Sequence, residues 1–364
     1  MSDEIVPEFN SWLEELLNGE GSDLHVKVGS APMIRLPKGL KRLERDPLTA
    51  IETQAIADGI VPAERREGFH ENGEVDFAYS VSNIGRFRAN VFKQRGSISM
   101  VLRKLRFGGP SFEEMGLPDV IRTLAQEDRG MILVTGPTGA GKTTTLAAMI
   151  DYINQTKPLH IVTIEDPIEV LHRDRVASIN QREVGNDTND FHTALRAALR
   201  QDPDVILIGE MRDTEAVRAA LSAAETGHLV LSTLHTVDAT ETVNRIIDFF
   251  PPYQQKQVRL QLAGTLRGII SQRLVPTVDG GRAPVLEILV NNGRVAERIS
   301  DPDKTLEIKE VIADGAFYGM VTFDQSLLGL LQEGRITVQD GMRAATSRHD
   351  FELAMQQAGI ALPV

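Results

Sequence analysis

The sequence predicts a two-domain α/β protein, in which a small α+β domain precedes a larger domain built on a parallel sheet. Its 364 residues are long enough for two hydrophobic cores. After residue 130, apolar strand-like runs alternate with amphipathic helical segments, which is typical of a parallel sheet with crossover helices. Before residue 105, three runs alternate apolar and polar residues between short turns, which is typical of antiparallel strands.

Residues 1–105 are expected to form the small domain. Apolar residues at helical spacing predict an amphipathic helix in the first 20 residues, namely Phe9, Trp12, Leu13, Leu16 and Leu17. Its polar face is acidic, so packing on its own domain is favoured over membrane contact. Short strands are expected in DLHVKVG and MIRLPKGLKRL, helices at residues 49–60 and 62–70, and strands in VDFAYSV, GRFRANVFKQ and SISMVLRKL.

A linker is expected at residues 106–118, where Gly, Pro and acidic residues follow no sustained period. The second domain then spans residues 119–364. Its strands are predicted at residues 131–135, 160–165, 204–208, 228–232 and 284–290, and its helices at residues 191–200, 214–225 and 240–250, before a helical C-terminal tail that runs to about residue 360. Ligands of such sheets bind at the carboxyl ends of the strands.

Composition narrows the classes of site and partner. The absence of cysteine excludes disulfides, thiolate zinc sites and cysteine nucleophiles. The net charge of -12 disfavours a broad contact with nucleic acid, although a local basic groove or a pore lined by several subunits stays open. No apolar run approaches the ~18 residues that cross a bilayer, and the N-terminus has no signal-like core, so a cytoplasmic protein is expected.

Residues 131–145, MILVTGPTGAGKTTT, carry the central motif, because an apolar run feeds a loop that matches G-x-x-x-x-G-K-[ST]. The residues expected to cradle phosphates are Gly136, Pro137, Thr138, Gly139, Ala140, Gly141, Lys142, Thr143 and Thr144. Lys142 is expected to reach the β and γ phosphates, and the Thr143 hydroxyl to hold Mg²⁺. The alternative, a glycine-rich turn that binds nothing, is disfavoured by the complete match and by the strand and helix around it.

Two acidic clusters follow predicted strands. In IVTIEDPIE, residues 161–169, Glu165, Asp166 and Glu169 are suited to holding Mg²⁺-bound water or polarising an attacking water. A turn with solvated acids is the alternative for that stretch. In DVILIGEMRD, residues 204–213, Glu210 is the remaining acid, because Gly209 stands where many P-loop ATPases have an aspartate. The alternative here is a buried strand with an ordinary polar end.

Histidines and arginines supply further candidates. In TGHLVLSTLHT, residues 226–236, His228 and His235 flank one strand and either sense the γ phosphate or serve the fold. Three arginines lie on predicted strands of the small domain: Arg86, Arg88 and Arg103. Each is either a surface residue or an arginine finger that reaches a nucleotide held by a neighbouring subunit.

Taken together, GPTGAGKTTT, TIEDPIE, GEMRD and TLHT resemble the Walker A, aspartate, atypical Walker B and histidine boxes of the type II/type IV secretion ATPases. The resemblance extends to the PilT family of type IV pilus retraction ATPases, from residues 22–35 to the helical tail. It implies an N-terminal PAS-like domain and a RecA-like P-loop ATPase domain, assembled as a homo-hexamer that hydrolyses ATP with Mg²⁺ to drive pilus retraction and twitching motility. It also implies an inner-membrane platform protein as partner, at the cytoplasmic face of the membrane.

The resemblance assigns roles to residues of this chain. Glu169 would be the general base, and Glu210 the Walker B acid that acts on Mg²⁺ indirectly. Arg88 and Arg103 would approach the neighbour's nucleotide. His228 and His235 would couple the phosphate state to domain movement.

Two features of the sequence bear on which subfamily the chain resembles, and they point in different directions. Assembly ATPases are typically longer and usually carry a four-cysteine zinc element, which favours retraction for this chain. Retraction ATPases usually carry an AIRNLIRE-like signature where this chain has RVAERISD, residues 294–301. An accessory or assembly role therefore stays open. A nucleic-acid translocase and a non-catalytic nucleotide-binding scaffold are more distant alternatives.

Overall fold

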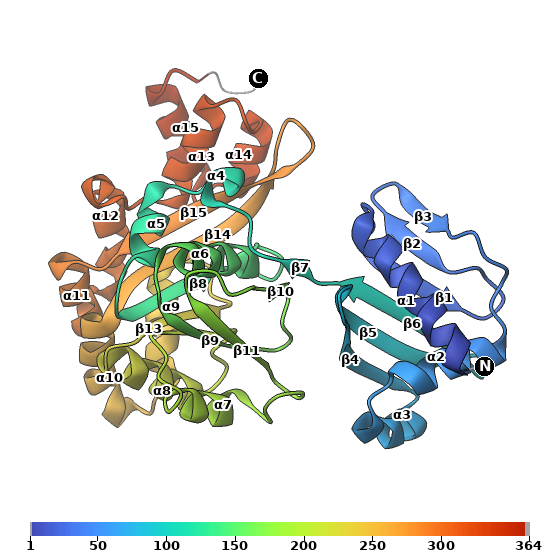
Figure 1. The fold of residues 1–364 in the computed structure, drawn as a ribbon. Coiled ribbons are helices and arrows are strands. Elements are labelled where there is room, and N and C mark those ends of the chain that lie inside the picture. The colour runs from blue at the N-terminus through green and yellow to red at the C-terminus, as the bar shows by residue number, and fades with distance from the viewer. Residues whose placement is uncertain (1, 361–364) are drawn as a thin grey trace. The chain divides into compact units, whose positions relative to one another are not determined.

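The computed structural model of the protein describes residues 2–360. The ends of the two expected domains, residue 1 and residues 361–364, lie outside the described residues. The chain has a mixed α/β fold and divides into two compact units, Met1–Arg106 and Phe107–Val364, each described here by itself (Figure 1).

Within residues 2–106, six strands form an antiparallel sheet in the order β3-β2-β1-β6-β5-β4. The strands are β1 (Asp23–Lys27), β2 (Met33–Leu36), β3 (Gly39–Arg42), β4 (Glu74–Val81), β5 (Gly85–Gln94) and β6 (Ser97–Lys104). The helices are α1 (Ser2–Asn18), α2 (Ala50–Ile60) and α3 (Arg66–Asn72), with the short 3₁₀ turn η1 (Ala63–Arg65). The predicted strands and helices of this region are confirmed.

One face of this first sheet is covered by α1 and α2 (Figure 1). The apolar stripe of α1 packs there, with Phe9 and Leu13 fully buried against inward-facing strand residues such as Leu102. Because side chains alternate along a strand, the residues between them face the other side. The strand register aligns Asp23 with Arg103, and Arg103 with Arg88, in one row across that outer face.

Within residues 107–360, seven strands form the second sheet in the order β11-β9-β12-β13-β8-β14-β15. All neighbours are parallel except β15, which is antiparallel to β14. The strands are β8 (Gly130–Thr135), β9 (His160–Glu165), β11 (Ser178–Glu183), β12 (Val205–Ile208), β13 (Leu229–Leu234), β14 (Leu266–Pro276) and β15 (Arg282–Val290). Two further short strands are β7 (Arg106–Phe107) and β10 (Val170–Leu171).

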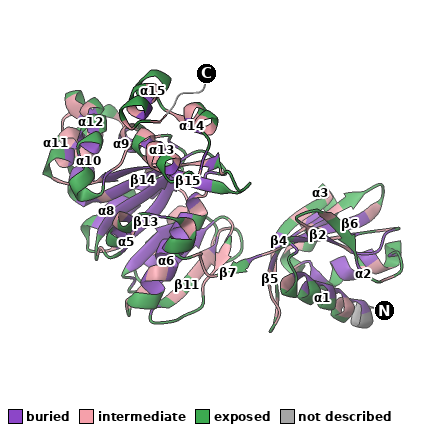
Figure 2. Cartoon of the chain, turned by 90° about the horizontal axis from the view of Figure 1, so that it is seen from above, coloured by how far each residue is buried: buried purple, intermediate pink, exposed green. Residues whose placement is uncertain are grey.

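Helices pack on both faces of the second sheet, so its central strands are buried along their length (Figure 2). In β8, Met131 and Leu133 enter one core, whereas Ile132 and Val134 enter the other. The helices are α4 (Phe112–Met115), α5 (Asp119–Ala125), α6 (Lys142–Thr156), α7 (Phe191–Ala198), α8 (Thr214–Glu225), α9 (Ala239–Asp248), α10 (Pro252–Thr265), α11 (Gly293–Ser300), α12 (Ile308–Ala313), α13 (Phe323–Gln332), α14 (Val338–Ala344) and α15 (Arg348–Gln357), with the 3₁₀ turns η2 (Pro302–Glu307) and η3 (Ala316–Tyr318).

The structure departs from the sequence expectation in the second unit. The segment expected to be an irregular linker contains α4, which starts at a capping box formed by Ser111 and Glu114. Strands β11 and β14 were not predicted. None of the helices within residues 2–360 combines the length and the apolar character needed to cross a bilayer.

Candidate active site

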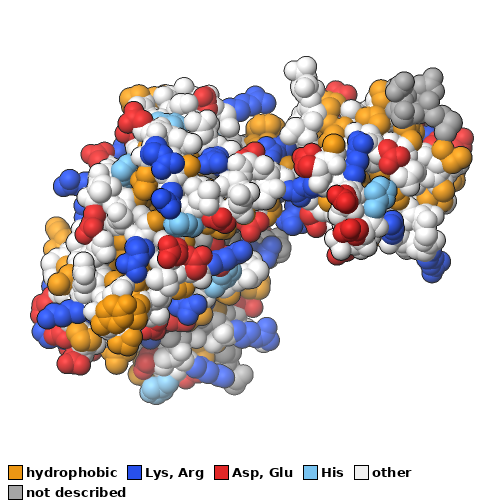
Figure 3. Space-filling view, turned by 90° about the horizontal axis from the view of Figure 1, so that it is seen from below, with side chains coloured by type: hydrophobic (Ala, Val, Ile, Leu, Met, Phe, Trp, Pro, Cys, Tyr) orange, Lys and Arg blue, Asp and Glu red, His pale blue; other side chains and the backbone are white. Residues whose placement is uncertain are grey.

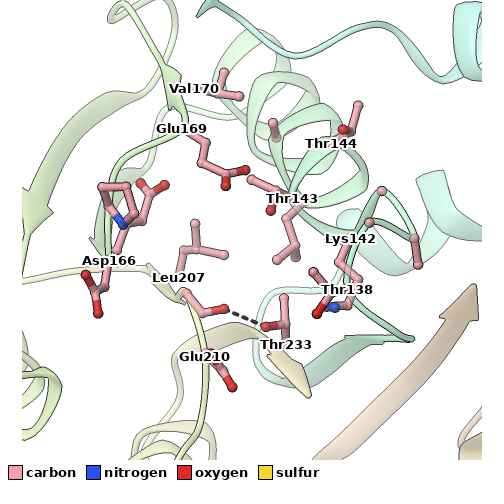
Figure 4. Close-up of a pocket in the computed structure, with 18 of the residues that line it drawn as sticks. Thr138, Lys142, Thr143, Thr144, Asp166, Glu169, Val170, Leu207, Glu210 and Thr233 are labelled. Atoms are coloured by element: carbon pink, nitrogen blue, oxygen red, sulfur yellow. Dashed lines mark hydrogen bonds between the residues drawn. The ribbon is translucent and has the colours of Figure 1, made fainter. Parts of the chain in front are cut away.

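The glycine-rich loop between β8 and α6 lines a pocket of about 480 Å³ (Figure 4). Gly136, Gly139 and Gly141 have positive φ angles of 142°, 79° and 87°. Side chains with a Cβ atom rarely adopt these conformations, so the curvature of the loop requires glycine there. Within the described residues no side chain caps the N-terminus of α6, which leaves its first N–H groups available to an anion.

Lys142 is buried at the start of α6 and bonds to the loop itself. Its Nζ donates to Gly136 O at 2.8 Å and to Pro137 O at 3.2 Å. Burial lowers the pKa of Lys142, and the charges of Glu210 and Glu169 oppose that shift. Burial disfavours the ammonium charge of Lys142. Negatively charged phosphate oxygens beside it would offset that cost and stabilise the charged form.

The acids that follow β9 divide into a buried group and groups that face the pocket. Glu165 is buried, and its Oε1 accepts from Thr163 Oγ1 at 2.6 Å and from Gln181 Nε2 at 3.2 Å. Burial raises the pKa of the Glu165 carboxyl. Glu169 instead is exposed and points across the pocket toward Thr143 (Figure 4). Asp166 is exposed as well but bonds to Arg212, so Glu169 is the exposed acid of this cluster that faces Thr143.

Five polar side chains form a chain of contacts along one wall of the pocket. Lys142 Nζ lies 3.5 Å from His235 Nδ1, and His235 Nε2 lies 3.3 Å from Glu210 Oε1. On the far side of Glu210, Oε2 accepts from Arg212 Nε at 2.9 Å. Arg212 Nη1 also donates to Asp166 Oδ2 at 3.4 Å. This series of contacts links the glycine-rich loop of residues 136–144, called the phosphate loop below, to the ends of β9, β12 and β13.

Gly209 precedes Glu210, and the structure explains why a glycine stands there. A Cβ atom at this position would lie 3.2 Å from Ile164 O, which is closer than most packing contacts of a Cβ atom. The backbone of Gly209 is held on both sides, by donation to Ile164 O at 2.8 Å and by acceptance from Thr233 Oγ1 at 2.7 Å (Figure 4). A side chain at position 209 would therefore require its neighbours to shift by a few tenths of an ångström.

The two histidines lie at opposite ends of β13. His235 lines the pocket, whereas His228 precedes the strand and its Nδ1 lies 3.0 Å from Ala223 O. The six-residue strand between them is about 20 Å long. Of these two histidines, His235 is therefore the one that lines the pocket.

The two arginines expected to act on a nucleotide lie on the outer face of the first sheet. Arg103 Nε donates to Asp23 Oδ1 at 2.7 Å, yet the Arg103 side chain is 69% exposed. Arg88, its direct cross-strand neighbour, lies 4.0 Å from Asp76 Oδ1 and is 51% exposed. Both guanidinium groups thus lie at the surface of their unit.

Sequence reasoning missed two residues that organise the site. Arg212 holds Glu210, and its position two residues after the acid at a strand end was the available signal. Gln272 contacts the phosphate loop from β14, a strand that the sequence pattern did not reveal. No local period relates Gln272 to the loop.

The oxygen atoms of the pocket suit Mg²⁺ that is shared with a bound phosphate, rather than a metal ion held by protein ligands alone. Thr143 and Glu210 line the pocket and offer oxygen atoms, which Mg²⁺ prefers. Within the described residues no group of three His, Cys, Asp or Glu side chains could hold a metal ion by itself. Mg²⁺ is commonly held by one or two protein groups together with substrate phosphates, and this pocket provides that number.

Known proteins with the same arrangement are found by sequence and by structure. The family model described as type II/IV secretion system protein matches residues 86–317. The chain is 42% identical to the type IV pilus retraction ATPase PilT of Pseudomonas aeruginosa, over 91% of this chain and 96% of that protein. It is 41% identical to the type IV pilus ATPase PilU of the same organism, over 96% of this chain and 91% of that protein. A crystal structure of the pilus retraction motor PilT with bound ADP matches with a TM-score of 0.86 and 46% identity, covering 94% of this chain and 98% of that chain.

Proposed function

Because the chain belongs to the type II/IV secretion system protein family, we propose that it is an ATP hydrolase that powers type IV pilus retraction. The observation that carries the proposal is the pocket in which Lys142 lies opposite Glu169 and Glu210. This combination joins phosphate binding to water activation in one cavity. The similarity to pilus retraction ATPases extends over most of the chain and supports the use of the energy for pilus movement.

We assign the hydrolytic roles as follows. Lys142 and the loop residues 136–144 bind the phosphates, and Lys142 exchanges its bonds to Gly136 and Pro137 for phosphate oxygens. Mg²⁺, when bound, neutralises charge on the β and γ phosphates. Thr143 would hold the ion directly, and Glu210 would act on it indirectly. Glu169, which faces the start of α6, accepts the proton of the attacking water.

His235 and Arg212 are suited to report the phosphate state. His235 lies between Lys142 and Glu210, so a change at either residue alters its contacts. Arg212 joins Glu210 to Asp166 and would transmit the same change to the loop after β9. We propose that β13 carries the movement from His235 toward His228, because a buried strand moves as a rigid body.

We further propose a homo-hexamer in which Arg88 and Arg103 reach the nucleotide of a neighbouring subunit. In this arrangement residues 1–105 are a PAS-like domain, residues 106–118 a linker, and residues 119–364 a RecA-like domain with a helical tail. The exposure of both arginines in their own unit supports the assignment. An arginine supplied in trans stabilises the charge of the transferring phosphoryl group.

The proposed partner is an inner-membrane platform protein, met at the cytoplasmic face of the membrane. Nucleic acid is disfavoured as a partner by the net charge of -12. On the face in Figure 3, acidic and basic side chains are interspersed, which also disfavours a long phosphate-backbone contact.

A second candidate is a pilus ATPase of the PilU kind, because the chain is similar to PilU over most of its length. Residues 294–301, which replace the AIRNLIRE-like signature, lie mainly in α11. Val295 and Ile299 keep the apolar i, i+4 spacing of that signature and are buried. The chain differs at the position of the leucine in that signature, where Arg298 stands and pairs with Glu297 and Glu307.

Two measurements test the proposal. The purified chain is expected to hydrolyse ATP with Mg²⁺, and Glu169→Gln is expected to bind nucleotide but to lose turnover. An inactive wild-type protein would instead indicate a nucleotide-binding scaffold. Deletion of the gene is expected to produce excess surface pili; loss of pili would indicate assembly, and an unchanged number would indicate the accessory role.

A further inference from the structure

Gln272 in β14 is a buried side chain that contacts the phosphate loop from outside the pocket. Its Nε2 donates to Ala140 O at 2.6 Å, and its Oε1 accepts from Thr145 Oγ1 at 2.9 Å. Gln272 is 1% exposed and Thr145 is fully buried, so both bonds are shielded from water. The amide therefore bridges the last part of the loop to the first turn of α6.

Chemistry fixes the orientation of this amide. Ala140 O is only an acceptor, so the NH₂ group must face it and the oxygen must face Thr145. The backbone of Gln272 also meets the start of the loop, because a Cβ atom at Gly136 would lie 2.3 Å from Gln272 O. A Cβ atom at Gly141 would lie 3.1 Å from Gln272 Nε2. One residue thus contacts both ends of the loop.

We propose that Gln272 is a positioning residue that holds the phosphate loop in its anion-binding curvature, with Thr145 as its partner. The inference rests on the proposed function, since it requires that the loop binds nucleotide. A loop that turns its N–H groups toward an anion turns carbonyl groups away from it. A buried carbonyl needs a donor, and Gln272 supplies one to Ala140 O.

The inference distinguishes Gln272 from the residues that line the pocket. Gln272 is not among the lining residues of the pocket described above, so it acts on nucleotide through the loop. Its loss leaves Ala140 O without its donor in a dry environment, and the loop must then bend toward another donor. Nucleotide affinity should consequently fall more than the rate of the bound enzyme.

The test uses the full chain and a fluorescent ADP analogue. Gln272→Met keeps the volume but removes both polar groups, and Thr145→Val removes the second bond alone. Ser232→Ala is the matched control, because Ser232 is fully buried in the same sheet and its Oγ donates to a backbone carbonyl, Ile208 O, at 2.8 Å. Gln272→Met is expected to weaken ADP binding about tenfold, Thr145→Val less, and Ser232→Ala less than about twofold.

A pH series with Gln272→Glu, with thermal unfolding of the variant recorded at each pH, separates positioning from simple loss of stability, because only positioning predicts a change in ADP affinity over the pH range in which the variant stays folded. At pH 8 the ionised carboxylate presents no donor to Ala140 O, whereas the protonated acid donates an O–H. Burial raises the pKa of such a carboxyl, so its protonated form becomes more populated as the pH falls toward 6. Relative to wild type, ADP affinity of Gln272→Glu is expected to recover as the pH falls from 8 to 6. This ratio decides the matter should Gln272→Met fail to fold.

The outcomes separate this inference from the proposed function. If wild type binds no ADP, the proposed function is wrong. If wild type binds ADP but Gln272→Met binds as tightly as Ser232→Ala, or the ratio for Gln272→Glu does not change with pH, the inference alone is wrong.

Discussion

The two sheets of this chain present polar groups in different ways. In the first sheet, helices cover one face, and polar side chains that belong to the paired strands, such as Asp23, Arg88 and Arg103, stand on the other face. In the second sheet, helices cover both faces, and the polar groups of the pocket follow strand ends, as Glu210 and His235 do. The pairing register of the strands therefore determines where the polar residues of the first sheet lie. The positions at which the strands end determine where the polar residues of the pocket lie.

This difference has a consequence for how each set tolerates change. A one-residue slip in β5 or β6 would turn the arginines of the first unit into the apolar core. In the second unit, packing on both sides buries the polar side chains inside the strands, so each bonds to a neighbouring group, as Ser232 does to Ile208 O and Gln272 does to Ala140 O. Substitutions at the strand ends and on the strand face should therefore affect ATP hydrolysis and folding stability to different extents.

The largest effect is expected for Lys142→Ala, at the start of α6 after the loop that follows β8. ATP hydrolysis should fall by more than about 10³-fold, because the residue bonds the loop and meets the phosphates. The fold should survive, since burial already lowers the pKa of Lys142 and the charge is not a source of stability. Steady-state phosphate release and thermal unfolding measure the two parts. If Lys142→Ala hydrolysed ATP near the wild-type rate, the pocket at the strand ends would not be the site of hydrolysis.

The next effect is expected for Arg103→Ala, on the strand face. Hydrolysis should fall on the order of 10²-fold, because Arg88 remains beside it and an arginine finger contributes much of the transition-state stabilisation. If the arginine acts on a neighbour's nucleotide, co-assembly of Arg103→Ala with Lys142→Ala should restore turnover. Each Arg103→Ala subunit keeps its own loop and gains an arginine from its neighbour.

The control for this mixture is co-assembly of Lys142→Ala with Glu210→Ala. Both changes disable the nucleotide pocket of the subunit that carries them, so this pair should not recover. Recovery with Glu210→Ala, or no recovery with Arg103→Ala, would contradict action of the strand face in trans.

Local patterns predicted the elements whose cause is local. The alternation in residues 75–104 predicted β4, β5 and β6, and the loop motif predicted the start of α6. The edge strand β11 was missed because its sequence, SINQRE, is largely polar, and β14 was missed because Gly268 and Arg273 interrupt its apolar run. The capping box of α4 was present in the sequence but was read as part of a linker.

Long-range contacts in the candidate site could not be predicted. Gln272 and Ala140 are 132 residues apart and meet only because β14 pairs with β8. The contacts of His235 with Lys142 and with Glu210 likewise depend on which strand ends adjoin. Residue types in the motifs predicted which groups gather, and the sheet order determined which of them touch.

Glu287 provides an exception within the second sheet, because it is a carboxyl group in the interior of β15. Its Oε1 accepts from Ala239 N at 2.9 Å, and burial raises its pKa to about 7, although Lys309 and Arg273 oppose this. The folded protein thus holds a proton that the unfolded chain releases near pH 4.5. Stability from this group is present at low pH and is lost as pH rises toward 7.

Glu287→Gln should remove this pH dependence. Between pH 5 and pH 8, wild type should lose about 2–3 kcal/mol that the glutamine variant keeps. Hydrogen exchange of amides in β15 is the appropriate measurement, because the single tryptophan, Trp12, belongs to the first unit. Equal pH profiles for the two proteins would mean that the carboxyl is ionised in the fold.

The smallest effect is expected for Asp23→Asn, the strand-face counterpart of Glu287→Gln. Burial raises the pKa of Asp23, but the Ser22 hydroxyl and Arg103 outweigh it, so the pKa lies below its ordinary value of 3.8. This group therefore stabilises the fold above about pH 4, and the contribution is lost as pH falls. Arg103 is 69% exposed, so solvent screens the pair and the loss at pH 7 should be below about 1 kcal/mol.

Trp12 fluorescence during urea unfolding measures the effect of Asp23→Asn in the first unit, and added salt should reduce it. The result also bears on the strand face as a whole. A loss well above 1 kcal/mol that persists at high salt would mean that water does not reach the row formed by Asp23, Arg103 and Arg88. Such a loss in the assembled protein, together with a small loss in the separated subunit, would indicate that a neighbouring copy covers this face, as action of the arginines in trans requires.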